Sequence, residues 1–507
     1  MKKITKIAIF AYAIYMSIPL MVSFIAEYQL SNSLKQLSEV DGVKLTLLKY
    51  DRGYSSSVAA SMLEVSSNHS LYKDITSSNI TNFEDSELLQ FILVHHLKHG
   101  PYISSINAED TFLSGFALGK IRTLIRHGSV NDYNIDDLLV KAYAEEIDKD
   151  VVGSIATKVG FLGEVDSILV TDNAEINLPH DKGFVKWKDI VGEFDTTLTF
   201  NSFTGSVSVG EFEIQNIDKL KITNLRAAEI KHKSHTKAWI GESNFTVDAI
   251  YSYDANTEIP TNVLNLKYNS STTLAKDLVT KNMSVNLEAY KHSDNIYGPL
   301  SFDLTLERLD PAGLSFLQEV VSDSEKGVVS ILNRDVRANI IDALPLLLIN
   351  RPHLTLKTTI NTDTDTSFNG FADVKMGGRK VFNLQKEPAA LLNTADGFIK
   401  AEISKDKFHS VLSYFLKQHI RQESKDSEFE YDDDSLLNTE VDSLITDIVS
   451  RLVAANIIDS NSDTYLIDVE VYKGKLKLND VYYSISEILD DKRPVEEFLS
   501  GKDNEVE

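Results

Sequence analysis

The sequence of 507 residues contains no cysteine. Disulfide bonds, cysteine-ligated zinc, iron–sulfur clusters and thiol catalysis are therefore excluded for this chain. It also lacks a GxxxxGK(S/T) phosphate loop and a GxGxxG turn after a strand, so nothing in it indicates nucleotide chemistry. Basic residues are few, 51 against 75 acidic ones, which gives a net charge of −24. Such a charge argues against nucleic acid as a partner, because that binding depends on cations that neutralise phosphates.

A long apolar run near the N-terminus is the most informative feature that the sequence has. Three lysines, Lys2, Lys3 and Lys6, precede an uncharged apolar segment over residues 7–26. Twenty residues in a helix rise about 30 Å, which matches the hydrocarbon core of a bilayer. The positive flank predicts a cytoplasmic tail over residues 1–6, with the rest of the chain across the membrane. We therefore expect a single-pass membrane protein whose C-terminal domain lies across the membrane, which in a bacterium means the periplasm.

A cleavable signal peptide is the alternative for this segment. Cleavage needs small residues before the cut, but the bulky Phe24 and Ile25 precede Ala26. The apolar run is also longer than a usual signal core. An uncleaved anchor is therefore favoured, and leucines at helical spacing after it predict a stalk helix over 27–42.

The apolar pattern beyond the stalk predicts an α+β domain with a long, curved antiparallel β-sheet and packed helices. Changes in this pattern divide the chain into 43–162, a hairpin plus a helical region; 163–310, an antiparallel sheet region; 311–350, a helical region; 351–460, strands and helices with an acidic linker over 423–434; 461–500, a C-terminal hairpin and helix; and 501–507, an acidic tail.

Three apolar stripes at helical spacing predict the helices of the 43–162 region. They comprise Leu88, Phe91, Ile92 and His95; then residues from Leu113 to Leu124, with Arg126 in the last turn; then residues from Ile135 to Ile147. After Gly163 the period changes to two, which predicts strands with one apolar and one solvated face. The apolar parity reverses across Gly210, which predicts a β-bulge or bend there. Asp310 and Pro311 have the pattern of a helix start.

Four patterns were weighed as sites of chemistry, and none favours an activity. His95, His96 and His99 would place two imidazoles one helical turn apart, but they lack the glutamate of HExxH, so packing is favoured over zinc. The serines after Gly53 lack the glycines of a nucleophile elbow. The acidic linker lacks calcium-loop spacing, and carboxylate pairs are too common in this chain to indicate a glycosidase. We therefore predict no catalytic residue, no metal site, no cofactor and no enzyme.

Three short stretches together resemble the YdgA-like family of bacterial envelope proteins. The matching residues are Tyr50, Arg52, Gly53, Ser55 and Ser56 in the first stretch; His99, Gly100 and Pro101 in the second; and Tyr472, Gly474 and Asn479 in the third. The resemblance implies an inner-membrane protein with a large periplasmic domain and no established enzymatic role. It does not cover the helical stretch near residues 105–150 or the acidic linker.

Most of these residues suit structural roles, because glycine and proline fix turns. Arg52 and His99 are the exceptions, since an arginine in a tight turn either pairs with a carboxylate or holds an anionic head group. Our first hypothesis is a non-enzymatic protein whose curved sheet presents an apolar face to an envelope lipid or protein. A homo-oligomeric scaffold is the second alternative, and a carboxylate- or serine-dependent envelope hydrolase is the third.

Overall fold

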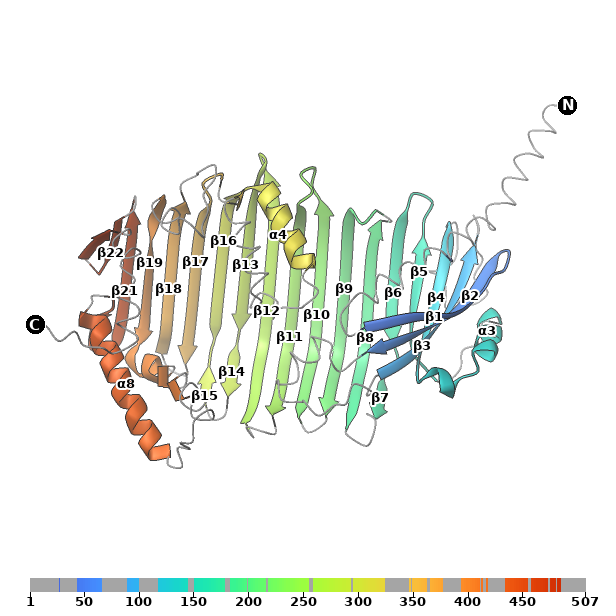
Figure 1. Ribbon diagram of the computed structural model, residues 1–507, viewed down its shortest axis with the longest axis horizontal. Helices are drawn as coiled ribbons and strands as arrows, with labels where there is room; N and C mark the ends of the chain where they lie inside the picture. The colour runs from blue at the N-terminus through green and yellow to red at the C-terminus, as the bar shows by residue number, and fades with distance from the viewer. Residues whose placement is uncertain are drawn as a thin grey trace, which may run out of the picture.

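The computed structural model describes Glu27 and most of residues 43–484, with longer gaps at 66–88, 100–116, 324–345, 377–393 and 418–433 and several shorter ones. Within that part of the chain, 23 strands form one sheet. Figure 1 shows them side by side in a broad band, with the N-terminal strands at one end and the C-terminal strands at the other. The sheet continues through the predicted boundaries at 163, 311 and 461.

The strands of the first half are β1 (Val43–Asp51), β2 (Ser56–Val65), β3 (Leu89–His99), β4 (Gly119–His127), β5 (Val151–Val159), β6 (Glu164–Thr171), β7 (Ala174–Asn177), β8 (Phe184–Thr197), β9 (Ser202–Gln215), β10 (Lys219–Lys233) and β11 (Trp239–Asp254). Those of the second half are β12 (Ile259–Ala275), β13 (Leu278–Leu287), β14 (Ala289–His292), β15 (Asn295–Tyr297), β16 (Leu300–Leu309), β17 (His353–Thr362), β18 (Asp365–Met376), β19 (Ala395–Ser404), β20 (Asp459–Ser460), β21 (Thr464–Tyr472), β22 (Lys475–Leu478) and β23 (Val481–Ser484). The helices whose bounds are described are η2 (Val130–Asp132), α3 (Ile135–Tyr143), α4 (Pro311–Asp323) and α8 (Asp434–Ala454), and residues 405–410 are helical as well.

All strand pairs are antiparallel, and most join strands that are close in sequence. The ladder runs from β1 through β6, passes to β8 and continues to β13, then crosses β16 to β19 and ends with β21, β22 and β23. The short strands β7, β14 and β20 pair beside it with β8, β12 and β21. This order is a meander, which needs only short connections.

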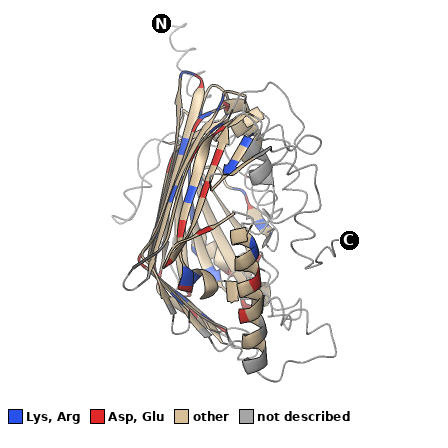
Figure 2. Ribbon diagram, turned by 90° about the vertical axis from the view of Figure 1, so that its left-hand side faces the viewer, with Lys and Arg blue, Asp and Glu red and all other residues tan. Residues whose placement is uncertain are grey.

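The sheet is curved, and the helices α4 and α8 lie on its concave side (Figure 2). Leu314 of α4 packs there against Val279 and Leu309 of β13 and β16. Farther along, Phe91 of β3 packs against Trp187 of β8, because the N-terminal strands cross over the same side. We call the side of the sheet that these residues occupy the concave face, and the opposite side the convex face.

A line of left-handed residues in alternate strands of the sheet changes the side-chain parity. Trp187 and Ile190 of β8 lie three positions apart, yet both pack in the same concave cluster. Between them Asp189 has a φ of 53°, and Asn224 in β10 and Asn265 in β12 each have a φ of 50°. Such values suit asparagine and aspartate among non-glycine residues. The change of parity keeps the apolar side chains on the concave face along the whole strand.

Of the bulge or bend predicted at Gly210, the bulge is excluded, while the change of parity is there. Val209 pairs with Leu225 and Phe212 pairs with Ile222, so the register of β9 and β10 does not shift at the glycine. A bulge would add one residue to one strand. The left-handed residues of the flanking strands make the bend instead. A Cβ on Gly210 would lie 3.1 Å from a carboxylate oxygen of Asp189, so a side chain there would crowd the bend.

Most other predicted elements after residue 130 are confirmed. The helix start at Asp310 is one of them, because its Oδ1 accepts from the amides of Ala312 at 2.9 Å and Gly313 at 3.2 Å. The predicted helices near 135 and 437 are α3 and α8, the strands after Gly163 are β6 to β16, and the two later hairpins are β17–β18 and β21–β22. The sheet dominates more than an α+β class implies, since helices are few in the described residues.

Two of the predicted helices are wrong. Residues Leu89–His99 form β3, and Gly119–His127 form β4, both strands inside the sheet. The reason is that β3 is buried on both sides. Ile92 packs with α3 and β2, whereas Phe91 packs against β8 on the other side. A strand with two covered faces needs no polar alternation, so its apolar residues can fall at helical spacing by coincidence.

Among the described residues, no helix is long and apolar enough to cross a membrane. The predicted anchor over 7–26 lies outside those residues. So do most of the predicted stalk and acidic linker, residues 324–345 of the predicted helical region, the part of the C-terminal unit after residue 484 and the acidic tail.

Candidate functional site

The first predicted motif stretch forms the turn between β1 and β2. Gly53 is required there, because a Cβ would lie 2.1 Å from the carbonyl oxygen of Ser56. The guanidinium of Arg52 forms an ion pair with Glu27, the residue that follows the predicted anchor. Tyr50 pairs with Ala59 across the hairpin. Arg52 was expected either to pair with a carboxylate or to hold an anionic head group, and the structure shows the pair with a carboxylate.

The second motif stretch contacts the first. The backbone amide of His99 donates to the carbonyl of Ser55 at 2.8 Å, and its Nε2 lies 2.9 Å from Oγ of Ser57. The same hydroxyl lies 3.3 Å from the amide of Gly53. His99 thus ties the turn to β3. Gly100 and Pro101 lie outside the described residues.

The third motif stretch lies at the opposite end of the sheet, in β21 and β22 (Figure 1). Asn479 closes that hairpin with two hydrogen bonds to Asp468, both 2.9 Å long. The backbone amide of Asn479 donates to the carbonyl of Asp468, and the side-chain Oδ1 of Asn479 accepts from the backbone amide of Asp468. Tyr472 is exposed, and Gly474 is outside the described residues. The three stretches therefore do not converge on one site.

A second buried hydroxyl–imidazole contact lies next to the first. Nε2 of His95 lies 2.8 Å from Oγ of Ser61, and its Nδ1 lies 2.9 Å from Oγ1 of Thr123. Burial lowers the pKa of His95 to about 4, and burial followed by the charge of His96 does the same for His99. Both imidazoles are neutral at pH 7 and hold three strands together.

These contacts do not form a catalytic arrangement that a substrate could reach. Ser57 and Ser61 have no exposed surface, and His95 and His99 are 5% exposed. The histidines also lie on a strand, not one turn apart on a helix, which corrects the geometry weighed for zinc. In the described part of the chain no three metal-ligating side chains come close enough to hold an ion.

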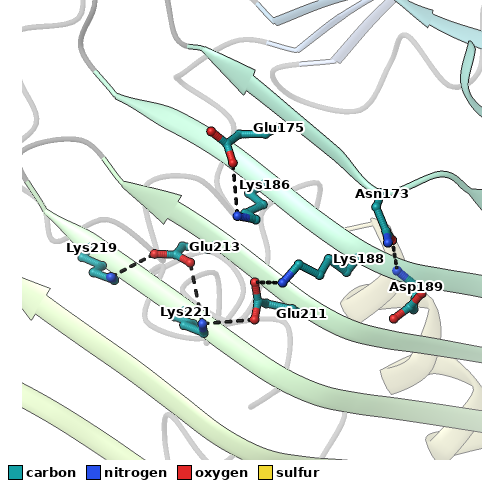
Figure 3. Close-up of polar contacts among 9 residues, drawn as sticks. All are labelled: Asn173, Glu175, Lys186, Lys188, Asp189, Glu211, Glu213, Lys219 and Lys221. Atoms are coloured by element: carbon teal, nitrogen blue, oxygen red, sulfur yellow. Dashed lines mark hydrogen bonds and ion pairs between the residues drawn. The ribbon is translucent and has the colours of Figure 1, made fainter. Parts of the chain in front are cut away.

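A charged ladder crosses the convex face from β7 to β10 (Figure 3). Glu211 accepts from Lys188 at 2.9 Å and from Lys221 at 3.1 Å, and Glu213 pairs with Lys219 at 2.9 Å. Hydrogen bonds from the lysines lower the pKa of Glu211. The signs alternate from strand to strand, so the ladder neutralises itself. The sequence analysis did not identify it, although the charges at every second position in three successive strands were a usable signal.

Shallow polar troughs occupy the middle of the convex face. One of about 580 Å³ is bordered by Asn265, Lys267 and Asn286, and another of about 290 Å³ by Asn269, Asn282 and Ser284. Their amide and hydroxyl groups largely bond to one another across strands, as Asn282 does to Ser271 at 3.2 Å. This face therefore presents a hydrogen-bonded polar surface.

The concave face carries an apolar row from β9 to β21. Register-paired residues make up its central line: Val207, Ala227, Phe245, Tyr268, Val285 and Phe302. The adjacent line continues toward the C-terminus through Met283, Leu304, Leu356, Ala372, Ile399 and Val469. Ile399 is 42% exposed, so this apolar surface reaches solvent at that point. The predicted alternation of apolar and solvated faces is confirmed here.

The family model described as "Bacterial protein of unknown function (DUF945)" matches residues 1–484. Because the match spans most of the chain, the protein belongs to this bacterial family. No curated protein and no solved structure matches it.

Proposed function

We propose that this member of the bacterial family of unknown function is a non-enzymatic envelope protein that binds lipid acyl chains on the concave face of its sheet. In this proposal residues 7–26 anchor it in the inner membrane and the sheet lies in the periplasm. The observation that carries the proposal is the apolar row that runs unbroken across strands from β9 to β21.

The shape of that row suits an acyl chain. Each methylene group that leaves water contributes about 0.8 kcal/mol, so a long, shallow apolar surface can hold a chain through many weak contacts. The surface crosses strands in register, and its side chains are aliphatic or aromatic without interruption along the central line. Exposed apolar residues such as Ile399 would then be covered by the ligand.

The location part of the proposal is supported by the sequence. Lysines before the apolar run of 7–26 favour an inner-membrane anchor, and the three stretches resemble YdgA-like envelope proteins. A protein held at the membrane by its N-terminus would have lipid within reach. The binding face and the anchor therefore support the same class of ligand.

Lipid that copurifies with matched variants tests the proposal. We would purify the full chain in detergent as wild type, Ile399→Asp and Phe371→Asp, and quantify lipid per chain by mass spectrometry. Ile399 lies on the concave face and Phe371 on the convex face of the next strand, and the two are 42% and 36% exposed. We expect Ile399→Asp to lose lipid severalfold while Phe371→Asp keeps it, because only the first places a charge on the binding face.

The control variant separates this lipid from lipid around the anchor, which both substitutions leave unchanged. Equal amounts of lipid in all three proteins would contradict the proposal. A loss of lipid in Phe371→Asp as large as that in Ile399→Asp would contradict it too, since it would remove the distinction between the faces.

A further inference from the structure

A group of polar side chains interrupts the apolar concave face near α4. Glu229 and Lys231 in β10 have the parity of Leu225 and Ala227 on that face. Cross-strand pairing places Glu229 opposite Ser243 and Ser243 opposite Ser270, and it places Thr272 opposite Lys281. We call these six residues the lysine cluster. The sequence analysis did not identify it, although charged residues at an apolar parity were a signal.

Lys281 is the central cation of the lysine cluster. Its Nζ donates to Oγ of Ser270 at 3.3 Å and to Oγ1 of Thr272 at 3.5 Å, and both hydroxyl residues are 8% exposed. No carboxylate of the described residues lies within ion-pair distance of it. Burial, followed by the nearby charge of Lys231, lowers its pKa, and the carboxylate of Glu229 opposes part of this decrease. A partly buried ammonium held only by long bonds to neutral hydroxyls keeps capacity for an anion.

Lys231 adds a second positive charge at the same place. It forms an ion pair with Glu229, which also accepts from Oγ of Ser243 at 2.8 Å. The side chains of Lys231 and Glu229 are 39% and 34% exposed, so the cluster opens to solvent. Two lysines therefore face one carboxylate, which leaves a net positive charge in a chain whose total is −24.

The surroundings of the lysine cluster are apolar on both sides. The neighbouring register line contains Phe245, Tyr268 and Phe302. On the other side Leu274 and Val279 pack with α4. Charge and apolar surface are thus adjacent on one face, which is the arrangement that matches a molecule with an anionic head and long apolar tails.

We propose that the lysine cluster binds the phosphate of an anionic phospholipid whose acyl chains lie along the neighbouring apolar row. Lys281 and Lys231 donate charge-assisted hydrogen bonds to the phosphate oxygens, and the hydroxyls of Ser270 and Thr272 donate to the same group. This inference rests on the proposed function, because it names the class of lipid that the concave face takes.

The test measures which lipid the full chain selects. The protein in detergent is offered an equimolar mixture of phosphatidylglycerol and phosphatidylcholine, and native mass spectrometry counts each bound lipid. Variants are Lys281→Met, which keeps an unbranched side chain one atom shorter and without the charge, and Lys281→Arg, which keeps the charge. Lys267→Met, on the convex face of β12, is the matched control. Inorganic phosphate is added as a competitor in a separate series.

We expect wild type, Lys281→Arg and Lys267→Met to enrich phosphatidylglycerol, and Lys281→Met to lose that enrichment roughly tenfold, the effect of one charge-assisted bond. Total lipid should stay nearly constant in Lys281→Met, because the apolar row is unchanged. Unchanged selectivity in Lys281→Met would overturn the headgroup inference while leaving the proposed function intact. Wild type without bound lipid would overturn both. Displacement of phosphatidylglycerol by millimolar inorganic phosphate would indicate a site for free phosphate and overturn the lipid assignment.

If Lys281→Met does not fold, Lys231→Met provides the same test on the more exposed lysine. We expect it to reduce the enrichment several-fold, and a wild-type ratio of the two lipids in that variant would also overturn the inference.

Discussion

The two faces of the sheet differ in how their charged side chains are paired. On the convex face the carboxylates of the ladder pair with lysines of neighbouring strands, as Glu211 does with Lys188 and Lys221. On the concave face charges are rare, and the hydrogen bonds of Lys281 in the described structure go to hydroxyls, with the carboxylate of Glu229 near it. The convex face therefore pairs its charges internally, whereas the concave face carries the residues that we propose bind lipid.

The largest effect should come from a charge placed in the concave core. We expect Val247→Asp to lower the free energy of unfolding by about 4 kcal/mol or more, because Val247 is 2% exposed and an unpaired buried carboxylate is costly. Asn244→Asp, on the exposed convex side of the same strand, should change it by less than about 0.5 kcal/mol. Urea denaturation of both variants measures this, and equal losses would remove the distinction between the faces.

The next effect concerns pH and the buried imidazoles. Burial lowers the pKa of His95 from its ordinary 6.5 to about 4, so on acidification the unfolded state binds the proton before the folded state does. The contribution of His95 to stability is then fully present above pH 6.5 and is lost as the pH falls toward 4, by about 3 kcal/mol. Denaturation curves over this range check the loss.

His95→Gln should reduce the pH dependence between pH 6.5 and 4, and His99, whose pKa is also lowered to about 4, should supply what remains. His232→Gln, at an exposed position of β10, is the control. The ladder responds in a different window, since the pKa of Glu211 is lowered and its contribution is lost only as the pH falls below its ordinary 4.5. A wild-type pH profile in His95→Gln would contradict the neutral, buried state of this imidazole.

The smallest effect should come from the ladder itself. Lys221→Met removes the pairs to Glu211 and Glu213, yet these pairs lie on an exposed face. Exposed ion pairs contribute about 0 to 1 kcal/mol, and salt screens them. We expect a loss below about 1 kcal/mol that shrinks further in 1 M salt. A loss above about 2 kcal/mol would show that the convex face contributes more to stability than its exposure indicates.

The local pattern of the sequence was sufficient where one face of a strand is solvated. From β6 onward polar residues occupy the solvated face of each strand. The alternation of apolar and polar residues was therefore visible in the sequence, and this region was predicted correctly as strands. It was insufficient for β3, where Phe91 and Ile92 are covered from opposite sides by distant segments. Only the tertiary structure supplies that second cover, and a sequence window cannot contain it.

The candidate site was harder to predict than the fold, because it depends on register. Glu229, Ser243 and Ser270 lie on three strands and meet only because those strands pair in one alignment. The motif stretches were visible as sequence, but they serve the turn at Gly53 and the hairpin at Asn479 at opposite ends of the sheet. A turn is formed by residues that are consecutive in the sequence, so a short pattern can predict it. A surface formed by many strands contains residues that are far apart in the sequence, so no short pattern predicts it.

The most direct measurement of the central claim is photocrosslinking from the two faces of one strand. A benzoylphenylalanine placed at Met283 faces the concave row, and one placed at the adjacent Ser284 faces the convex trough. After irradiation in cells and purification of the full chain, mass spectrometry should find lipid-sized adducts at Met283 and none at Ser284. Adducts of equal yield at both positions, or adducts of protein mass alone at Met283, would contradict lipid binding on the concave face.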